Sequence, residues 1–246
     1  MTVGVVPGTR DDLTTVAETA TDAGRSVTVG SATEVTETDP AFVVAGDEPA
    51  LLALVRADCR APILPIDAGR GIRSVPATAA STAVANVIDG ESTTVEYSLI
   101  GVSAGREVLG RALFDVTLMT SEPAHISEYE LASNDGVVDR FRADGVVVAT
   151  PAGSHGYAAA AGGPIIEPGS SVVSVVPVGS FVTRQVNWVL DSSHVAVSIA
   201  RDESAVSLFV DGREVGPCSP AQRLELAADE ELSVLVVPES EPTFDS

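Results

Sequence analysis

The chain has 246 residues, 45% of them hydrophobic, which is enough to bury one large core or two smaller ones. Its 35 acidic residues outnumber 14 basic residues, and the net charge of −21 excludes nucleic acid and anionic membranes as partners through charge repulsion. All 14 basic residues are arginines, so a P-loop and a protein-kinase phosphate site, which both require a lysine, are excluded as well.

The remaining composition points to an intracellular protein. No apolar run reaches the length of a membrane span, and no basic patch precedes an apolar stretch at the N-terminus, so we expect a cytoplasmic location. Cys59 and Cys218 are isolated, which favours neither a zinc site nor a disulfide framework. An acidic, lysine-free surface is typical of halophilic archaea, because high salt screens its self-repulsion.

The first 90 residues alternate short apolar runs with segments of helical spacing. Pro49 favours a helix start, because proline fits the first turn of a helix. This alternation predicts a parallel α/β sheet, whose ligand edge lies at the carboxyl ends of the strands. The predicted strands are residues 3–6, 27–29, 41–45 and 63–66, and the predicted helices are residues 11–25, the segment from Pro49 and residues 76–88.

After Asp89-Gly90 the pattern changes to alternating or β-branched runs with no long helix between them. This pattern predicts a mostly antiparallel β domain and a domain boundary near residue 90. The predicted strands are residues 93–102, 107–119, 126–131, 137–141, 172–178, 194–199, 206–210 and 232–237.

One stretch, residues 144–168, combines a buried strand with a loop of small residues. Its valines 146–148 predict the strand, and a glycine-rich segment follows directly. Small residues let a flat ligand approach the backbone, while Thr150 and Ser154 offer hydroxyls and Tyr157 offers an apolar face with a polar tip. The alternative is a tight strand-to-helix connection that binds no ligand.

This stretch resembles the signature of the NAD kinase family, which reads roughly DG-hydrophobic-(S/T)TPTGSTAY…AGGP. The resemblance implies an N-terminal parallel α/β domain and a C-terminal antiparallel β domain. It also implies that ATP, with Mg²⁺ or another divalent cation, phosphorylates NAD at the 2′ position, in a homodimer or homotetramer. The matching positions are Asp144-Gly145, Thr150-Pro151, Gly153-Ser154, Tyr157 and Ala161-Gly162-Gly163-Pro164.

The same resemblance divides the chain by role. Residues 1–90 are expected to form an α/β nucleotide-binding domain, residues 91–226 a β-rich NAD-binding domain, and residues 227–246 a segment that returns to the first domain.

Asp47 is the expected catalytic residue. Ala45-Gly46-Asp47 resembles the start of the family's GGDGT motif, which implies that Asp47 takes the proton of the ribose 2′-hydroxyl and that Gly46 belongs to the phosphate loop. The alternative is a carboxylate that only caps the following helix. The motif then departs from the family, because Pro49 has no N–H for a phosphate and Glu48 adds negative charge.

Further matches lie in two other segments. Residues 67–71 resemble the family's NTGxLG segment, which places Gly69 and Arg70 in the phosphate and nucleotide loop. Phe114-Asp115 stands where the family has Asn-Glu or Asn-Asp, so the carboxylate is kept while an amide is lost. Asp211-Gly212 matches a family DGQ turn, although a hairpin turn explains it as well. The implied NAD contacts are Asp115, Asp144, Thr150, Ser154, His155 and Tyr157.

Three other functions compete with an ATP-dependent NAD kinase. A protein of the same fold could bind NAD(P) or another nucleotide without phosphorylating it, and a kinase could use polyphosphate or a different acceptor. Residues 152–156 also approximate the nucleophile elbow of a hydrolase. Only Asp191 and His194 follow in the order of a triad, three residues apart, which strains the geometry.

Overall fold

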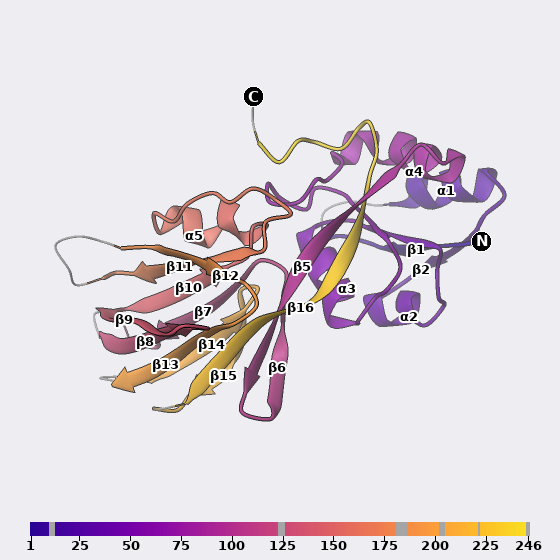
Figure 1. The fold of residues 1–246 in the computed structure, drawn as a ribbon. Helices are drawn as coiled ribbons and strands as arrows, with labels where there is room; N and C mark the ends of the chain where they lie inside the picture. The colour runs from indigo at the N-terminus through magenta and orange to yellow at the C-terminus, as the bar shows by residue number, and fades with distance from the viewer. Residues whose placement is uncertain (10–12, 123–125, 181–185, 202–204, 221, 245–246) are drawn as a thin grey trace. The chain divides into compact units, whose positions relative to one another are not determined.

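The structure is a computed structural model, and it describes all residues except 10–12, 123–125, 181–185, 202–204, 221 and 245–246 (Figure 1). The chain divides into two compact units. Unit 1 contains residues 1–97 and 231–246, and unit 2 contains residues 98–230. The chain passes between them within two long strands, β5 (Thr93–Ala104) and β16 (Arg223–Val236).

Unit 1 is built on a parallel sheet in the order β2-β1-β3-β4-β16. Helices α1 and α4 pack together on one face of this sheet and α2 and α3 on the other (Figure 1). The strands are β1 (Thr2–Val6), β2 (Ser26–Val29), β3 (Phe42–Ala45) and β4 (Ile63–Pro65), and the helices are α1 (Thr14–Asp22), α2 (Ala32–Thr36), α3 (Glu48–Arg56), η1 (Ala77–Ala79) and α4 (Ala80–Asp89).

Local sequence signals explain where these helices begin and end. Pro49 lies in the first turn of α3, and Gly90 ends α4 in the left-handed region at φ +83°. Helix α2 was not predicted, although Ser31 and Glu34 form a capping box at its start. The predicted first residues of α1, 11 and 12, lie outside the described residues.

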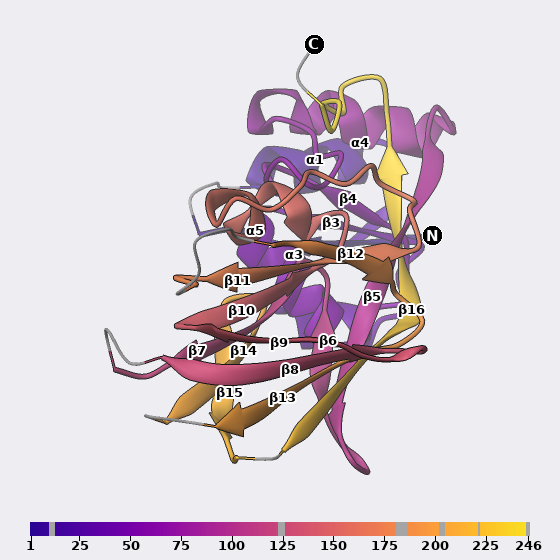
Figure 2. The ribbon, with the colours of Figure 1, turned by 60° about the vertical axis from the view of Figure 1, so that its left-hand side comes forward.

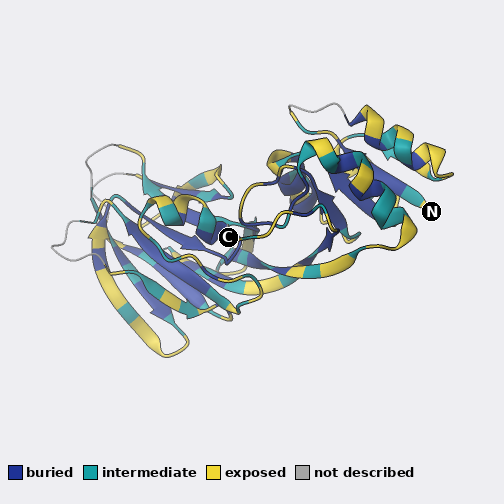
Figure 3. Cartoon of the chain, turned by 90° about the horizontal axis from the view of Figure 1, so that it is seen from above, coloured by how far each residue is buried: buried dark blue, intermediate teal, exposed yellow. Residues whose placement is uncertain are grey.

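The core of unit 1 is mostly aliphatic, in keeping with the low aromatic content. All four residues of β3 are buried, and Val44 packs in one cluster with Val3 and Leu64. Viewed from above, the helices turn their exposed residues outward and their buried residues toward the sheet (Figure 3). The predicted parallel α/β sheet is confirmed.

The C-terminal segment lies in unit 1. In β16, Val234 pairs in parallel with Ile63 of β4. Farther along, the Asn86 side chain donates to both carboxylate oxygens of Glu239, at 3.0 and 2.9 Å, and the Glu241 N–H donates to the Ser74 carbonyl at 2.8 Å. These bonds hold the residues after β16 against α4 and the loop that precedes it.

Unit 2 consists of antiparallel strands. One sheet has the order β12-β11-β10-β7-β14-β15, the strands β16, β13, β8 and β9 form a second set, and β5 pairs with β6 (Figure 2). The strands are β6 (Glu107–Ala112), β7 (Asp115–Thr120), β8 (Ser127–Ser133), β9 (Gly136–Ala143), β10 (Gly145–Ala149), β11 (Val172–Val178), β12 (Trp188–Asp191), β13 (Val195–Arg201), β14 (Val206–Val210) and β15 (Arg213–Cys218).

The predicted antiparallel β domain is confirmed, with three differences, one of which is that β16 begins at Arg223 and not at the predicted residue 232. The predicted strand 107–119 is two strands, because the chain leaves the ladder at Leu113-Phe114. Strands β12 and β15 were not predicted; β15 is an edge strand that contains Pro217, where a missing N–H is tolerated. Among the described residues, no helix is long and apolar enough to span a membrane.

Candidate functional site

The signature loop, residues 150–156, follows β10 and begins at Thr150, whose hydroxyl is bound within the protein. Thr150 Oγ1 donates to the Leu113 carbonyl at 2.6 Å and accepts from the Gly153 N–H at 3.1 Å. The Thr150 N–H donates to the Phe114 carbonyl at 2.9 Å. Thr150 is only 2% exposed, so its side chain joins the loop to the segment between β6 and β7.

Ser154 plays a similar part deeper in the loop. It lies in the short helix η2 (Gly153–His155), where Oγ donates to the Pro151 carbonyl at 2.6 Å and accepts from the Ile166 N–H at 3.0 Å. Its side chain is fully buried. Neither partner can act as a general base, so this geometry does not support a hydrolase nucleophile at Ser154.

Gly153 is required by the protein's own packing. A Cβ atom added there would lie 1.9 Å from the Phe114 carbonyl oxygen, far inside van der Waals contact. The sequence suggested that small residues admit a ligand to the backbone. At Gly153 the close neighbour is instead the backbone that precedes Asp115, so this glycine fixes the loop against β7.

The Thr150 hydroxyl makes a testable contribution to stability. Replacement by valine keeps the shape but leaves the buried Leu113 carbonyl and Gly153 N–H without the partner they now have. We expect Thr150→Val to lower the free energy of unfolding by about 2 kcal/mol or more. Thr150→Ser, which keeps the hydroxyl, is the control, and urea unfolding of both variants measures the difference. Equal stabilities would contradict this role.

Asp115, Asp144 and Tyr157 share one electrostatic neighbourhood. Asp115 begins β7 opposite Ala149 of β10, and its Oδ1 accepts from the Thr117 hydroxyl at 3.0 Å. Tyr157 begins α5 (Tyr157–Ala160) and is 42% exposed. Burial raises the pKa of the Tyr157 phenol, and the carboxylates of Asp115 and Asp144 raise it further. The phenol therefore stays protonated and can donate a hydrogen bond at neutral pH.

Asp144 and the remaining predicted residue of unit 2, His155, are both half-buried. Asp144 precedes β10, and a Cβ atom added at Gly179 would lie 2.3 Å from its Oδ2, so a larger residue at Gly179 would require the Asp144 side chain to move. His155 ends η2 and is half-buried between Ser154 and Gly156.

In unit 1, Asp47 occupies the carboxyl end of β3 and caps α3. Oδ1 accepts from the Ala50 N–H at 2.8 Å, which is the helix-cap bond. Oδ2 accepts from both the N–H and the hydroxyl of Thr9, at 2.6 and 2.9 Å. The capping role that the sequence left as an alternative is therefore present, and the carboxylate has a second role in fixing the loop after β1.

Glycines make this second contact possible. Strand β1 pairs with β3, so the loops that follow them emerge side by side at one sheet edge. A Cβ atom at Gly46 would lie 2.3 Å from the Gly8 nitrogen, and one at Gly8 would lie 2.8 Å from the Asp47 carboxylate carbon. Gly8 and Thr9 were not predicted as site residues, because their position depends on which strands are neighbours.

The second loop of unit 1 follows β4. Gly69 has a φ of +85°, and a Cβ atom added there would lie 3.0 Å from Glu48 Oε2, so the Glu48 carboxylate lies beside this loop. Asp67 has a φ of +44°, and its Oδ1 accepts from the Ala77 N–H at 3.2 Å. Arg70 is exposed. The structure thus gathers Gly46, Asp47, Glu48 and Gly69 at the carboxyl edge of the parallel sheet.

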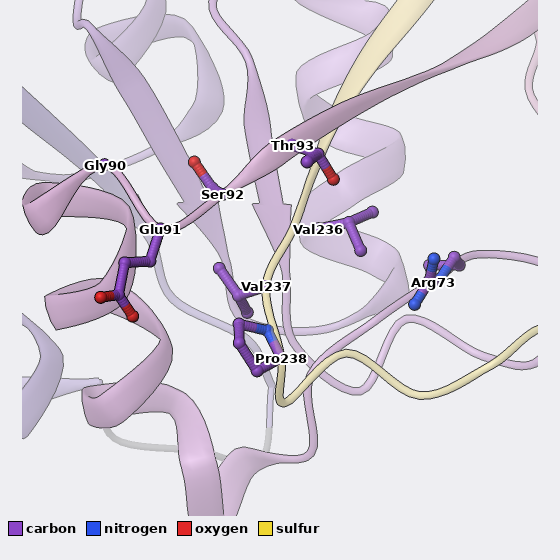
Figure 4. A pocket seen from close by; sticks show the side chains of 8 residues that line it. All are labelled: Arg73, Gly90, Glu91, Ser92, Thr93, Val236, Val237 and Pro238. Carbon is purple, nitrogen blue, oxygen red and sulfur yellow. The ribbon is translucent and has the colours of Figure 1, made fainter.

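A cavity in unit 1 is separate from the predicted site residues. An open cavity of about 510 Å³ in unit 1 is lined by none of the predicted site residues (Figure 4). Within the described part of the chain, no group of three or more His, Cys, Asp or Glu side chains is arranged to hold a metal ion. The cavity lining is Arg73, Gly90, Glu91, Ser92, Thr93, Val236, Val237 and Pro238.

Comparison with known proteins identifies relatives over most of the chain. The profile of the ATP-NAD kinase C-terminal domain matches residues 113–237, just over half of the chain. The NAD kinase of Methanosarcina acetivorans is 38% identical over 121 residues, which are 49% of this chain and 44% of that relative. The NAD kinase of Methanospirillum hungatei is 28% identical over 192 residues, or 77% of this chain and 71% of that protein.

Solved structures share the fold. An NAD kinase from Archaeoglobus fulgidus in complex with ATP superimposes with a TM-score of 0.79 at 22% identity, covering 97% of this chain and 94% of that one. Yeast NADH kinase complexed with NADH gives a TM-score of 0.76 at 17% identity, covering 97% and 84%. Among the sequence relatives, the matched region covers 44%, less than half, of the Methanosarcina acetivorans NAD kinase.

Proposed function

The chain belongs to the ATP-NAD kinase family, and from that premise we propose that it phosphorylates NAD at the 2′ position to form NADP. The observation that carries the proposal is the Asp47 carboxylate, which is fixed at the carboxyl edge of the parallel sheet by Ala50 and Thr9. This edge is where open α/β sheets bind their ligands. A fixed carboxylate there can serve as a general base without first being ordered.

In the proposed reaction, Asp47 accepts the proton of the 2′-hydroxyl of the adenosine ribose. That oxygen forms a bond to the γ-phosphorus of ATP, the bond from this phosphorus to the bridging oxygen breaks, and ADP leaves. A divalent cation that arrives with ATP supplies positive charge to the phosphates. Of the contacts to Asp47, the Thr9 hydroxyl is a rotatable donor, so we propose that the ribose hydroxyl exchanges with it.

The residues of unit 2 are proposed to hold the dinucleotide. Asp115 and Asp144 supply hydrogen-bond acceptors for ribose hydroxyls, and Tyr157 supplies an exposed ring with a protonated phenol. His155 is proposed to contact NAD from the same loop. We assign Thr150 and Ser154 to positioning, because their hydroxyls are buried and bound to the backbone.

The phosphate loop departs from the family in a way that bears on the donor. Pro49 lies in the first turn of α3 and has no N–H to offer a phosphate, while the Glu48 carboxylate lies beside Gly69. We propose that Arg70 and the backbone around Gly46 and Gly69 contribute to the donor site. Polyphosphate is the second donor to test, because it presents a phosphate chain without a nucleoside.

The test is NADP formation by the purified protein with ATP, Mg²⁺ and NAD, followed with an NADP-specific dehydrogenase. Molar KCl is included because the net charge of −21 needs screening. Parallel reactions contain polyphosphate in place of ATP, or NADH in place of NAD. We expect NADP from at least one donor. No product from either donor or acceptor would contradict the proposed activity.

A binding protein on the same scaffold is the second candidate function, and the altered loop at Glu48-Pro49 is the observation that favours it. It predicts saturable binding of NAD or NADP by calorimetry with no phosphoryl transfer. A cytoplasmic location, expected from the composition, and a homodimer or homotetramer, implied by the family resemblance, complete the proposal.

A further inference from the structure

A two-residue turn joins β14 to β15 and places an aspartate in an unusual backbone conformation. Asp211 and Gly212 have φ values of +49° and +70°. Both central residues of such a hairpin turn need positive φ, which aspartate tolerates better than most residues. The sequence analysis noted a family match at Asp211-Gly212 but assigned the aspartate no role beyond a hairpin turn.

The Asp211 carboxylate reaches the segment between β6 and β7. Oδ1 accepts from the Phe114 N–H at 2.7 Å and the Asp115 N–H at 3.1 Å, and Oδ2 accepts from the Leu113 N–H at 2.9 Å. In return, the Asp211 N–H donates to the Asp115 carbonyl at 2.9 Å. The carboxylate thus supplies partners for three consecutive backbone donors where the chain leaves β6 and enters β7.

The backbone carbonyls of the same segment are bound by the signature loop. The carbonyl of Leu113 accepts from Thr150 Oγ1, and the carbonyl of Phe114 accepts from the Thr150 N–H. Residues 113–114 are therefore held through their N–H groups by Asp211 and through their carbonyls by Thr150. Asp115 follows immediately, so its position depends on both attachments.

We propose that Asp211 is a positioning residue for the NAD site, which sets the place of the Asp115 carboxylate and of the adjoining signature loop. This inference rests on the proposed function, because Asp115 is proposed there to contact the dinucleotide. Only an ionised carboxylate can accept from all three N–H groups; an amide has one oxygen and a nitrogen that donates.

Two substitutions remove the carboxylate but keep a residue that tolerates the backbone conformation of the turn. Asp211→Asn keeps a residue that tolerates positive φ, but its amide nitrogen cannot accept from Leu113. Asp211→Gly also permits the turn and removes the side chain altogether. Asp39→Asn is the matched control, because Asp39 is an exposed aspartate at φ +47° in unit 1.

We expect circular dichroism to show that both Asp211 variants remain folded. Their KM for NAD should rise about tenfold or more, because small misplacements of binding groups are costly. The rise should be larger for Asp211→Gly than for Asp211→Asn. The KM for ATP should stay within about twofold, and Asp39→Asn should change neither constant. An unchanged KM for NAD in the folded variants would overturn the inference, as would equal rises for both substrates, which indicate a general structural defect.

Calorimetric titration with NAD distinguishes failure of this inference from failure of the proposed kinase. If the wild type forms no NADP but binds NAD, the same about tenfold loss of affinity is expected in the Asp211 variants. If the wild type binds no NAD, both the proposed function and this inference fail. If the wild type forms NADP and the variants match it, only the inference fails.

Discussion

Asp47→Asn is expected to reduce the rate of NADP formation by about 10²- to 10⁴-fold, the usual contribution of a general base. The variant is informative because asparagine caps helices about as well as aspartate, so α3 should keep its bond from the Ala50 N–H. The Thr9 N–H would face an amide nitrogen in one orientation, which weakens that contact. The initial rate and the KM for NAD measure the effect.

A second helix cap provides the control for stability. Ser31 caps α2, where its side chain accepts from the Glu34 N–H and donates to the Glu34 carboxylate, and Glu34 is not a proposed site residue. Ser31→Ala should lower the free energy of unfolding by about 1 kcal/mol and leave the rate of NADP formation unchanged. A rate for Asp47→Asn within about twofold of the wild type would show that the carboxylate acts only as a helix cap and loop anchor.

Gly153→Ala is expected to have the largest effect on stability. Its new methyl group would lie 1.9 Å from the Phe114 carbonyl oxygen, and backbone atoms cannot move aside as a flexible side chain can. We expect the free energy of unfolding to fall by about 3 kcal/mol or more, at the upper end of overpacking effects. Urea unfolding followed by circular dichroism measures the change.

The control for Gly153→Ala is Ala160→Ser, which adds one heavy atom at an exposed position in the neighbouring helix α5. It should change the unfolding midpoint little. A midpoint for Gly153→Ala equal to that of the control would show that the loop can shift away from Phe114 at small cost, which contradicts the fixed contact described here.

The sequence predicted the division between a parallel and an antiparallel part because the hydrophobic pattern changes near residue 90. Short or interrupted elements were not predicted from this pattern. Helix α2 has only five residues, too few to show a repeating helical pattern of apolar residues, although its capping box was present. Strand β15 was missed because Gly216 and Pro217 interrupt it, and the sequence does not reveal that it lies at a sheet edge.

The candidate site shows the same limit at the level of single contacts. The position of Asp47 at a strand end followed from local sequence, but its bonds to Thr9 required knowing that β1 and β3 are neighbours. Likewise, the sequence suggested that the Thr150 hydroxyl faces a ligand, whereas its partner Leu113 lies 37 residues away in the chain. Partners distant in sequence are set by topology, which composition and periodicity do not encode.

The most direct test of the proposed kinase follows the phosphate itself. ATP labelled with ³²P at the γ position is incubated with the protein, Mg²⁺ and NAD in molar KCl, and the products are separated by chromatography. We expect label in NADP, and we expect a phosphatase to release it, because a 2′-phosphate is a monoester. Label that stays in ATP or appears only as inorganic phosphate, while calorimetry shows that the protein binds NAD, would contradict it.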